Sequence, residues 1–472
     1  VMSMRFLLLV TLGLTSMFSS ACAKENDHAQ RARAAFDLLA EAIQFETVAG
    51  RSQVCPYART LKAHFVAAGF AESDAQIFEL EEDDTCSLVV RYPGDDGERR
   101  PVIFLAHMDV VDALPEDWSY PPFEMTREGD RLYGRGVMDN KGSVAAITST
   151  LLSLKTTDYR STRDLYFVVT GDEETTAKTT RLLFSQVPAL STAKYALNAD
   201  AGLGVLNAER KPVYFQLQTA EKTYATFELT TRNAGGHSSL PRHDNAIYEL
   251  SQALVQLQGF RFPVRSTEST IAYFRETSKL FPGPVGQHMA AFAADPSDKV
   301  AIDFLDQMPG EAAMIRTTCV ATTLQGGHAE NALPQTASSM VNCRIFPGVS
   351  LETVEALIIE AIGDVDVSIR AMFRPSENPP SVIDPAIIEA VSFALERDYA
   401  GIPVIPYVAP YSTDGAIFRA NGVPTYGVSG QFIVYPEEKR AHGKDEFLPV
   451  DSFVKSLHYW EALIRAVSSE SP

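Results

Sequence analysis

A short apolar run that ends in a histidine and an aspartate constrains the fold of this chain most strongly. Val102 to Ala106 is continuously apolar, and His107-Met108-Asp109 follows directly. Such a run is typical of a strand buried on both faces of an α/β sheet. Farther along, the segment Gly-Arg-Gly-Val-Met-Asp-Asn-Lys-Gly over 134–142 adds the carboxylate of Asp139. One imidazole and two carboxylates have the chemistry of a metal site.

Strands and helices alternate around this run. The pattern predicts helices over residues 57–68, 142–154 and 179–186, and strands over residues 76–80, 86–92, 102–106, 165–170 and 195–199. This alternation indicates an α/β domain with a mixed sheet whose faces are covered by helices.

The order of the expected strands and helices changes after about residue 223. The expected order is strand 224–232, helix 246–257, strands 318–324 and 337–346, helix 351–362 and strand 367–373. Strand-helix-strand-strand-helix-strand is typical of a compact ferredoxin-like α+β domain. A long insertion over 262–315, with Pro282-Gly283-Pro284 inside it, is expected to be irregular. We therefore predict a catalytic domain in two parts, 24–218 and 378–472, with a smaller domain inserted at 219–377.

The first residues have the pattern of a secretory signal peptide. Arg5 precedes the apolar run 6–14, and small residues lead to Ala21-Cys22-Ala23. We favour cleavage after residue 23 by ordinary signal peptidase, and the alternative is a lipoprotein with a lipid anchor on Cys22. Both alternatives place the mature protein outside the cytoplasm, secreted or periplasmic.

Four further cysteines suit such a compartment. Cys55 with Cys86, and Cys319 with Cys343, are possible disulfides, and four buried free thiols are the alternative. The formal net charge of −19 argues against nucleic acid as a partner, because binding phosphates requires a basic face. After the first residues, no apolar run approaches the length needed to span a membrane.

More candidate ligands follow the expected strands. Asp172-Glu173-Glu174 and Asp200 each come directly after one, and the carboxyl ends of parallel strands meet at one edge of a sheet. His442 lies late in the chain, in Ala-His-Gly-Lys-Asp-Glu. A hydrolytic site with two metals needs terminal ligands, a bridging carboxylate and a base. Asp109 is placed to orient the His107 ring.

The order of these motifs resembles a known family. His-x-Asp, Gly-Arg-Gly-x-x-Asp-x-Lys-Gly, Asp-Glu-Glu, Asp and a late Ala-His-x-x-x-Glu are similar to the two-zinc metallopeptidases that include aminoacylase, carboxypeptidase G, acetylornithine deacetylase and succinyl-diaminopimelate desuccinylase. The resemblance covers nearly the whole mature chain. Gly236-His237-Ser238-Ser239 and the large inserted segment look most like the Gly-X carboxypeptidase branch.

The resemblance implies a role for each motif. One metal would be held by His107 and Asp200, and the other by Glu174 and His442. Asp139 would bridge them and Glu173 would be the general base for the attacking water. Two Zn²⁺ ions suit such mixed ligands, and Co²⁺ or Mn²⁺ could also bind.

The inserted domain would contribute to the same reaction. By the resemblance, His237 stabilises the oxyanion. Arg344, with Asn331, would clamp the free carboxylate of the substrate, since a guanidinium pairs bidentately with a carboxylate. Gly430 belongs to a late loop that lines the family's pocket.

The sequence thus predicts a secreted metal-dependent hydrolase that cleaves an amide bond next to a free carboxylate. Its substrate would be a small peptide or an N-acyl amino acid. The alternative is a non-catalytic binding protein that retains the metallopeptidase fold. The inserted domain would be a lid or dimerisation domain, and the protein a homodimer or a monomer.

Overall fold

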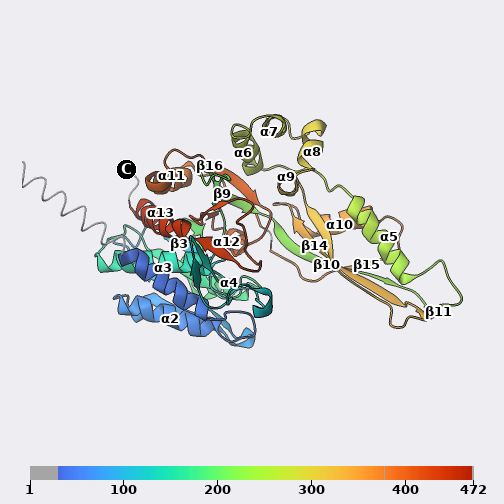
Figure 1. Cartoon of the computed structure of the whole chain (residues 1–472), viewed down its shortest axis with the longest axis horizontal. Coiled ribbons are helices and arrows are strands. Elements are labelled where there is room, and N and C mark those ends of the chain that lie inside the picture. The colour runs from blue at the N-terminus through green and yellow to red at the C-terminus, as the bar shows by residue number, and fades with distance from the viewer. Residues whose placement is uncertain (1–29, 377, 470–472) are drawn as a thin grey trace, which may run out of the picture.

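The computed structural model describes residues 30–376 and 378–469. The signal peptide predicted for residues 1–23, including Cys22, lies outside the described residues. Two parts are evident in Figure 1: a large α/β part around a broad sheet, and an elongated domain that projects from it. No helix in the described residues is long and apolar enough to cross a membrane.

A mixed ten-stranded sheet forms the centre of the large part. Its order is β1-β2-β6-β3-β7-β17-β9-β8-β18, with β16 paired to β9. The strands are β1 (Ala75–Leu80), β2 (Thr85–Tyr92), β3 (Val102–His107), β6 (Leu165–Thr170), β7 (Tyr195–Asn198), β8 (Gly204–Leu206), β9 (Pro212–Glu221), β16 (Val404–Ala409), β17 (Thr425–Gly427) and β18 (Phe432–Val434). Because β3 is parallel to both β6 and β7, the carboxyl ends of these three strands meet at one edge.

Helices cover both faces of this sheet, as the apolar runs predict. Phe104 of β3 belongs to a core that also contains residues of a helix over 30–44 and of α2 (Val54–Ala67), α3 (Lys141–Thr156), α11 (Pro385–Tyr399) and α13 (Val450–Ser468). Its neighbours Ile103 and Leu105 point to the opposite face, where α4 (Lys178–Gln186) and α12 (Gly415–Ala420) contribute. Successive side chains of a strand alternate between faces, so a strand covered on both sides is apolar throughout.

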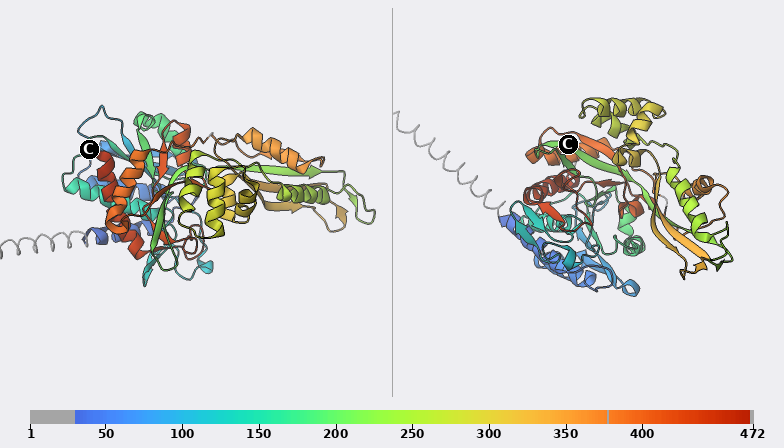
Figure 2. Two further views of the ribbon diagram at one scale, coloured as in Figure 1. Left: turned by 90° about the horizontal axis from the view of Figure 1, so that it is seen from above. Right: turned by 45° about the vertical axis from the view of Figure 1, so that its right-hand side comes forward.

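The inserted domain has the predicted ferredoxin-like topology. Four antiparallel strands, β10 (Thr223–Arg232), β12 (Thr318–Gly326), β14 (Thr336–Ile345) and β15 (Ser368–Ala371), follow the order β12-β14-β10-β15. The helices α5 (Ala246–Gly259) and α10 (Leu351–Ile362) share a core with one face of this sheet. We call this unit the small domain, and it extends away from the large part (Figure 2).

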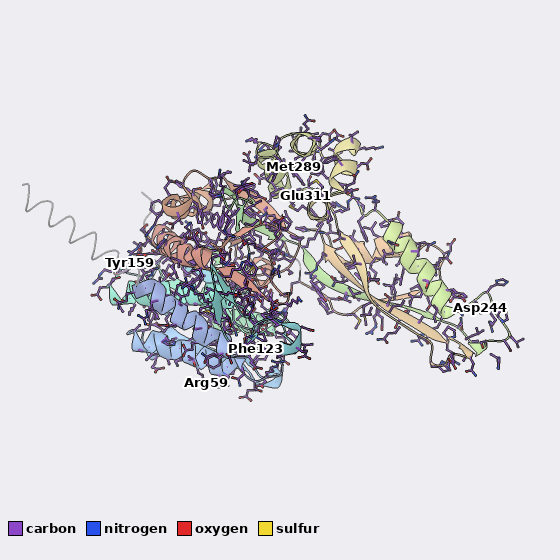
Figure 3. All side chains as sticks on the ribbon, in the orientation of Figure 1. Arg59, Phe123, Tyr159, Asp244, Met289 and Glu311 are labelled. Carbon is purple, nitrogen blue, oxygen red and sulfur yellow. A yellow bond between two sulfur atoms is a disulfide. The ribbon has the colours of Figure 1, made fainter. Side chains whose placement is uncertain are left out.

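The expectation of an irregular insertion over 262–315 is wrong. The segment forms α6 (Glu268–Thr277), α7 (Pro284–Ala294), α8 (Lys299–Leu305) and α9 (Pro309–Ile315). Thr267 and Asp298 cap two of these helices, and prolines begin the other two. Proline suits the first turn of a helix, because the amide hydrogen it lacks would have no partner there. Met289 and Glu311, labelled in Figure 3, mark the helices, whose core is shared with β9 and β16.

Of the two alternatives for the four cysteines, the structure has the disulfides. Cys55 on α2 is bonded to Cys86 on β2, and Cys319 on β12 is bonded to Cys343, its direct partner on β14. The first joins a helix to the central sheet, and the second joins neighbouring strands of the small domain.

Candidate metal centre

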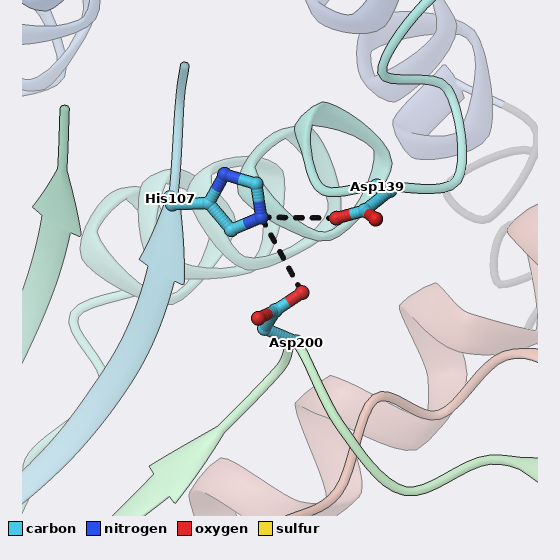
Figure 4. Close-up of side chains that lie close together, drawn as sticks. All are labelled: His107, Asp139 and Asp200. Atoms are coloured by element: carbon cyan, nitrogen blue, oxygen red, sulfur yellow. Dashed lines mark hydrogen bonds and ion pairs between the residues drawn. The ribbon is translucent and has the colours of Figure 1, made fainter. Parts of the chain in front are cut away.

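His107, Asp139 and Asp200 meet at the carboxyl edge of the central sheet (Figure 4). His107 ends β3, Asp200 follows β7, and Asp139 lies just before α3. The Nε2 atom of His107 is 3.0 Å from Oδ1 of Asp139 and 3.3 Å from Oδ1 of Asp200. These three side chains have the composition and spacing of a metal-binding group.

A second group shares Asp139 with the first. The Nε2 atom of His442 is 2.9 Å from Oε1 of Glu174 and 3.3 Å from Oδ2 of Asp139. One oxygen of Asp139 therefore faces His107 and the other faces His442. This is the arrangement that a carboxylate bridging two metal ions would have.

Asp109 organises the centre from behind. The Nδ1 atom of His107 lies 3.0 Å from the carbonyl oxygen of Asp109. Since a carbonyl can only accept, Nδ1 donates its proton there, and Nε2 is the nitrogen left to bind a metal ion. The carboxylate of Asp109 accepts the backbone N–H groups of Glu173 and Glu174, at 3.2 and 2.9 Å. Asp109 thus positions the imidazole and both glutamates.

Glu173 lies next to the centre with its carboxylate uncommitted. It groups with His107 and Glu174, and in the described residues its carboxylate oxygens accept no hydrogen bond. Removal from water raises the pKa of Glu173 well above its ordinary value, and the charge of Asp200 adds to this. An acceptor with free lone pairs suits a general base.

The electrostatics of the centre favour bound cations. Burial raises the pKa of Asp200 to about 7, although His107 opposes this shift. Hydrogen bonds to Asp139 and then Glu174 raise the pKa of His442 to about 10. Four carboxylates gathered around two imidazoles repel one another, and two divalent cations would neutralise them. The mixed nitrogen and oxygen donors fit Zn²⁺.

Glu446 is a buried support to which the sequence analysis assigned no role. Its carboxylate binds the guanidinium of Arg135 at 2.7 Å and accepts the backbone N–H groups of Gly136, Met138 and Asp139 at 2.9–3.1 Å. It therefore holds the loop that carries Asp139. The sequence did contain a signal for this residue, because Glu446 is the final glutamate of the motif Ala-His-x-x-x-Glu. The side-chain amide of Asn140, next to Asp139, donates to Oδ1 of Asp200 at 3.4 Å.

Arg344 lies on β14 of the small domain, opposite Tyr224 of β10 and Thr318 of β12. It is half-buried on β14, and its guanidinium lies over the ring of Tyr224, with 4.7 Å between the guanidinium carbon and the ring centroid. Burial lowers the pKa of Arg344, while the charges of Tyr224 and Glu173 act to raise it, so Glu173 is near enough to act electrostatically on Arg344. In the described part of the chain, the guanidinium makes no ion pair.

Gly430 lies in a buried loop that reaches the centre. It has φ +73°, and the next residue, Gln431, donates to the carbonyl oxygen of Met138 at 3.1 Å. A side chain at position 430 would overlap the ring of Tyr459. The conformation and packing of Gly430 are therefore structural requirements of this loop.

His237 and Asn331 are not brought to the metal centre of their own chain. His237 belongs to β11 (Gly236–His237), which pairs with β13 (Ala332–Leu333) at the far end of the small domain (Figure 1). The backbone N–H of Ser238 donates to the carbonyl oxygen of Asn331 at 3.2 Å. The two residues thus lie together at the exposed tip.

Comparison with known proteins identifies the family. A model of peptidase family M20/M25/M40 matches residues 103–466. The chain belongs to this family. The matched residues include the metal centre, Arg344 and the whole small domain, so the resemblance inferred from the motifs is confirmed.

Individual members show the same relationship. The chain is 27% identical over 386 residues to the N-fatty-acyl-amino acid synthase/hydrolase PM20D1 of Xenopus tropicalis, covering 80% of this chain and 75% of that protein. A dipeptidase of Saccharomyces cerevisiae matches the fold with a TM-score of 0.69 and 18% identity over 97% of this chain and 99% of its own. A metallo-carboxypeptidase of Sulfolobus solfataricus of the M20 family matches with a TM-score of 0.66 and 18% identity, covering 91% and 98% of the two chains.

Membership of family M20 agrees with the geometry of the centre. The family is metal-dependent, and the two ligand groups that share Asp139 are those expected of such a member. The chain is therefore a metallopeptidase or amidohydrolase of this family, with a mixed α/β fold.

Proposed function

We propose that this chain is a hydrolase that cleaves the amide bond next to a free carboxylate, in an N-acyl amino acid or in a peptide with a free C-terminus. The observation that carries this proposal is the position of Arg344. Its guanidinium has no acidic partner in the described residues, yet it lies within electrostatic reach of Glu173 beside the metal centre. An unpaired guanidinium at that position is suited to a substrate carboxylate.

The relatives support the same substrate chemistry. The N-fatty-acyl-amino acid synthase/hydrolase of Xenopus tropicalis carries in its name a compound with an amide bond beside a carboxylate. A peptide with a free C-terminus presents the same two groups. One pocket with a base and a guanidinium serves both classes.

The residues of the centre divide the work of hydrolysis. Two Zn²⁺ ions, one held by His107 and Asp200 and the other by Glu174 and His442 with Asp139 between them, would polarise the scissile carbonyl and acidify the attacking water. Glu173 takes the proton of that water and passes it to the leaving amine. Arg344 orients the substrate through its carboxylate.

Metal removal tests the proposal against the alternative of a binding protein. The purified protein is assayed with N-acyl amino acids and dipeptides before chelation, after chelation, and after Zn²⁺ is added back. We expect activity to be lost with the metal and restored by Zn²⁺. A chelated protein of unchanged activity would end the metal-dependent mechanism, and a zinc-loaded protein that binds these compounds without cleaving them would favour the binding protein.

Arg344→Ala tests the clamp directly. The variant should raise KM for substrates with a free carboxylate and leave KM for the corresponding amides unchanged, because only the former pair with the guanidinium. An unchanged preference for the acid would remove the observation on which the proposal rests.

His237 would serve the metal centre of a neighbouring subunit in a homodimer. The distance of the tip from its own centre supports this, as does the exposure of His237. Mixing the inactive variants His237→Ala and Glu173→Gln provides the test. A dimer that exchanges subunits should regain activity, because one of its centres then has both residues intact. A mixture that stays inactive, in a protein shown to be dimeric and exchanging, would refute the shared site.

Secretion into an oxidising compartment is proposed from two observations. The first residues have the pattern of a signal peptide, and the four remaining cysteines form two bonded pairs. Alkylation of the denatured, unreduced protein after expression with its leader should label none of the four. Labelling of these cysteines in protein recovered from the cytoplasm would argue against the assignment.

A further inference from the structure

A buried lysine lies at the junction of the central sheet and the small domain. Lys222 joins the end of β9 to the start of β10, and its side chain is 0% exposed. Its Nζ donates to Oγ1 of Thr318 at 3.1 Å. An ammonium carries three donors. Within residues 30–376 and 378–469, the other two have no hydrogen-bond partner and Lys222 makes no ion pair.

Lys222 shares one face of the small domain with Arg344. Thr318, which binds Lys222, is the direct partner of Arg344 across β12 and β14. Tyr224 is the direct partner of Arg344 across β10 and β14. Directly opposite residues present their side chains on the same face, and Lys222 precedes Tyr224 by two positions. The two cations therefore lie together at the base of the sheet, on the face away from α5 and α10.

Two neighbouring cations without a carboxylate are unfavourable away from water. Burial lowers the pKa of Lys222 to about 7, and the charges of Arg344 and Arg316 contribute to this. Arg316 has its own acid, Asp306, at 2.7 Å. Lys222 and Arg344 have none in the described residues. An anion with two oxygens would relieve the repulsion and use the free donors of both.

We propose that Lys222 and Arg344 together bind the carboxylate of the substrate. The planar guanidinium and the ammonium present donors from two directions, so a carboxylate can accept from both at once. This inference rests on the proposed function and deepens it, because it makes Lys222 a second determinant of specificity for substrates with a free carboxylate. With its carboxylate bound there, the substrate would place its scissile amide bond near Glu173 and the metal ions.

The test compares an N-acyl amino acid with its carboxamide in the zinc-loaded wild type and in Lys222→Met. Methionine keeps the length and apolar stem of the side chain and removes the charge. We expect kcat/KM for the N-acyl amino acid to fall about ten- to a hundredfold, mainly because KM rises, as for the loss of a charge-assisted hydrogen bond. The value of kcat/KM for the carboxamide should not change. Lys222→Arg should restore part of the loss.

A matched control comes from the same sheet. Arg370 on β15 is a cation that already has an acid, since it pairs with Glu228 at 2.7 Å. Arg370→Met should therefore leave the ratio of acid to amide unchanged. Thermal melting of each variant verifies that it is folded.

Calorimetry gives a second reading that does not depend on turnover. The N-acyl amino acid is titrated into zinc-loaded Glu173→Gln and into Glu173→Gln/Lys222→Met. We expect the second protein to bind about ten- to a hundredfold more weakly. A Lys222→Met variant that melts earlier but keeps wild-type affinity and the wild-type ratio would overturn the proposal, because Lys222 would then be structural only.

Failure of the proposed function looks different from failure of this inference. If the zinc-loaded wild type hydrolyses neither the acid nor the amide, the hydrolase assignment is wrong, and the calorimetric comparison still decides whether Lys222 holds the carboxylate.

Discussion

Asp139 connects the two halves of the metal centre because each of its oxygens faces a different histidine. Its position depends on Glu446, which binds the backbone N–H of Asp139 and those of two residues just before it. Asp139 is thus held through its backbone as well as through its side chain.

Glu173 is expected to accept the proton of the attacking water and to contribute nothing to metal affinity. Glu173→Gln keeps the shape of the side chain and removes its basicity, so kcat should fall about 10²–10⁴-fold. Metal analysis of the same sample should show unchanged zinc content. Glu82→Gln, in the exposed Glu81-Glu82 pair, is the matched control and should have wild-type activity. A Glu173→Gln variant with normal kcat would remove the base assignment.

The candidate ligands could be predicted because they follow recognisable apolar strands in the sequence. His107, Asp172-Glu173-Glu174 and Asp200 each stand where an apolar strand ends, and parallel strands bring such ends together. Lys222 had no comparable signal. Its importance depends on the register of β12 against β14, which places Thr318 opposite Arg344 and which no local pattern encodes.

At the scale of elements, periodicity predicted the buried strands and amphipathic helices well. It failed over 262–315, where Pro282-Gly283-Pro284 suggested a loop. In the structure Gly283 has φ +79° and precedes α7, which Pro284 begins. Proline and glycine can end one helix and also precede the start of the next. Whether they indicate a loop or a helix start therefore depends on the apolar positions that follow. Those positions pack against β9 and β16, segments that lie before and after the insertion in the chain.

The loop at Gly430 packs against α13 and offers a test of this contact. Gly430→Ala must strain a left-handed residue and overlap Tyr459, so we expect it to lower the free energy of unfolding by about 2–4 kcal/mol. Gly401→Ala has a similar φ of +74° and open space around it, and it should cost about 1 kcal/mol. Urea titrations of the two variants measure the difference. Equal losses would show that Tyr459 moves aside freely.

At the scale of the whole molecule, one centre depends on distant parts of the chain. His107 and His442 lie at opposite ends of the family match, and Arg344 belongs to a domain inserted between them. Sequence motifs predicted that these residues act together. They could not place the tip of the small domain, because the direction in which an inserted domain projects depends on packing at its junction. The position of His237 away from its own centre emerges only in three dimensions (Figure 2).

Metal removal should make the stability of the whole molecule depend on pH. In the metal-free folded chain the pKa of Asp200 is raised by burial from 3.8 to about 7, so the folded state binds more protons than the unfolded state between these values. Stability must then fall as pH rises through this window. The pKa of His442, raised from 6.5 to about 10 mainly by its hydrogen bond to Asp139, extends the fall to higher pH. Bound Zn²⁺ would take the place of these protons, so the zinc-loaded protein should not lose stability in this way.

The melting temperatures of zinc-loaded and chelated protein should therefore diverge as pH rises from about 5 to about 8. Calorimetric scans at constant ionic strength measure the gap at each pH. His442→Ala, which lacks a ligand of one ion and a proton-binding group of the free centre, should show a smaller increase of the gap. A gap that stays constant or narrows would mean that the carboxylates are not crowded in the metal-free protein, and that the centre opens when its ions leave.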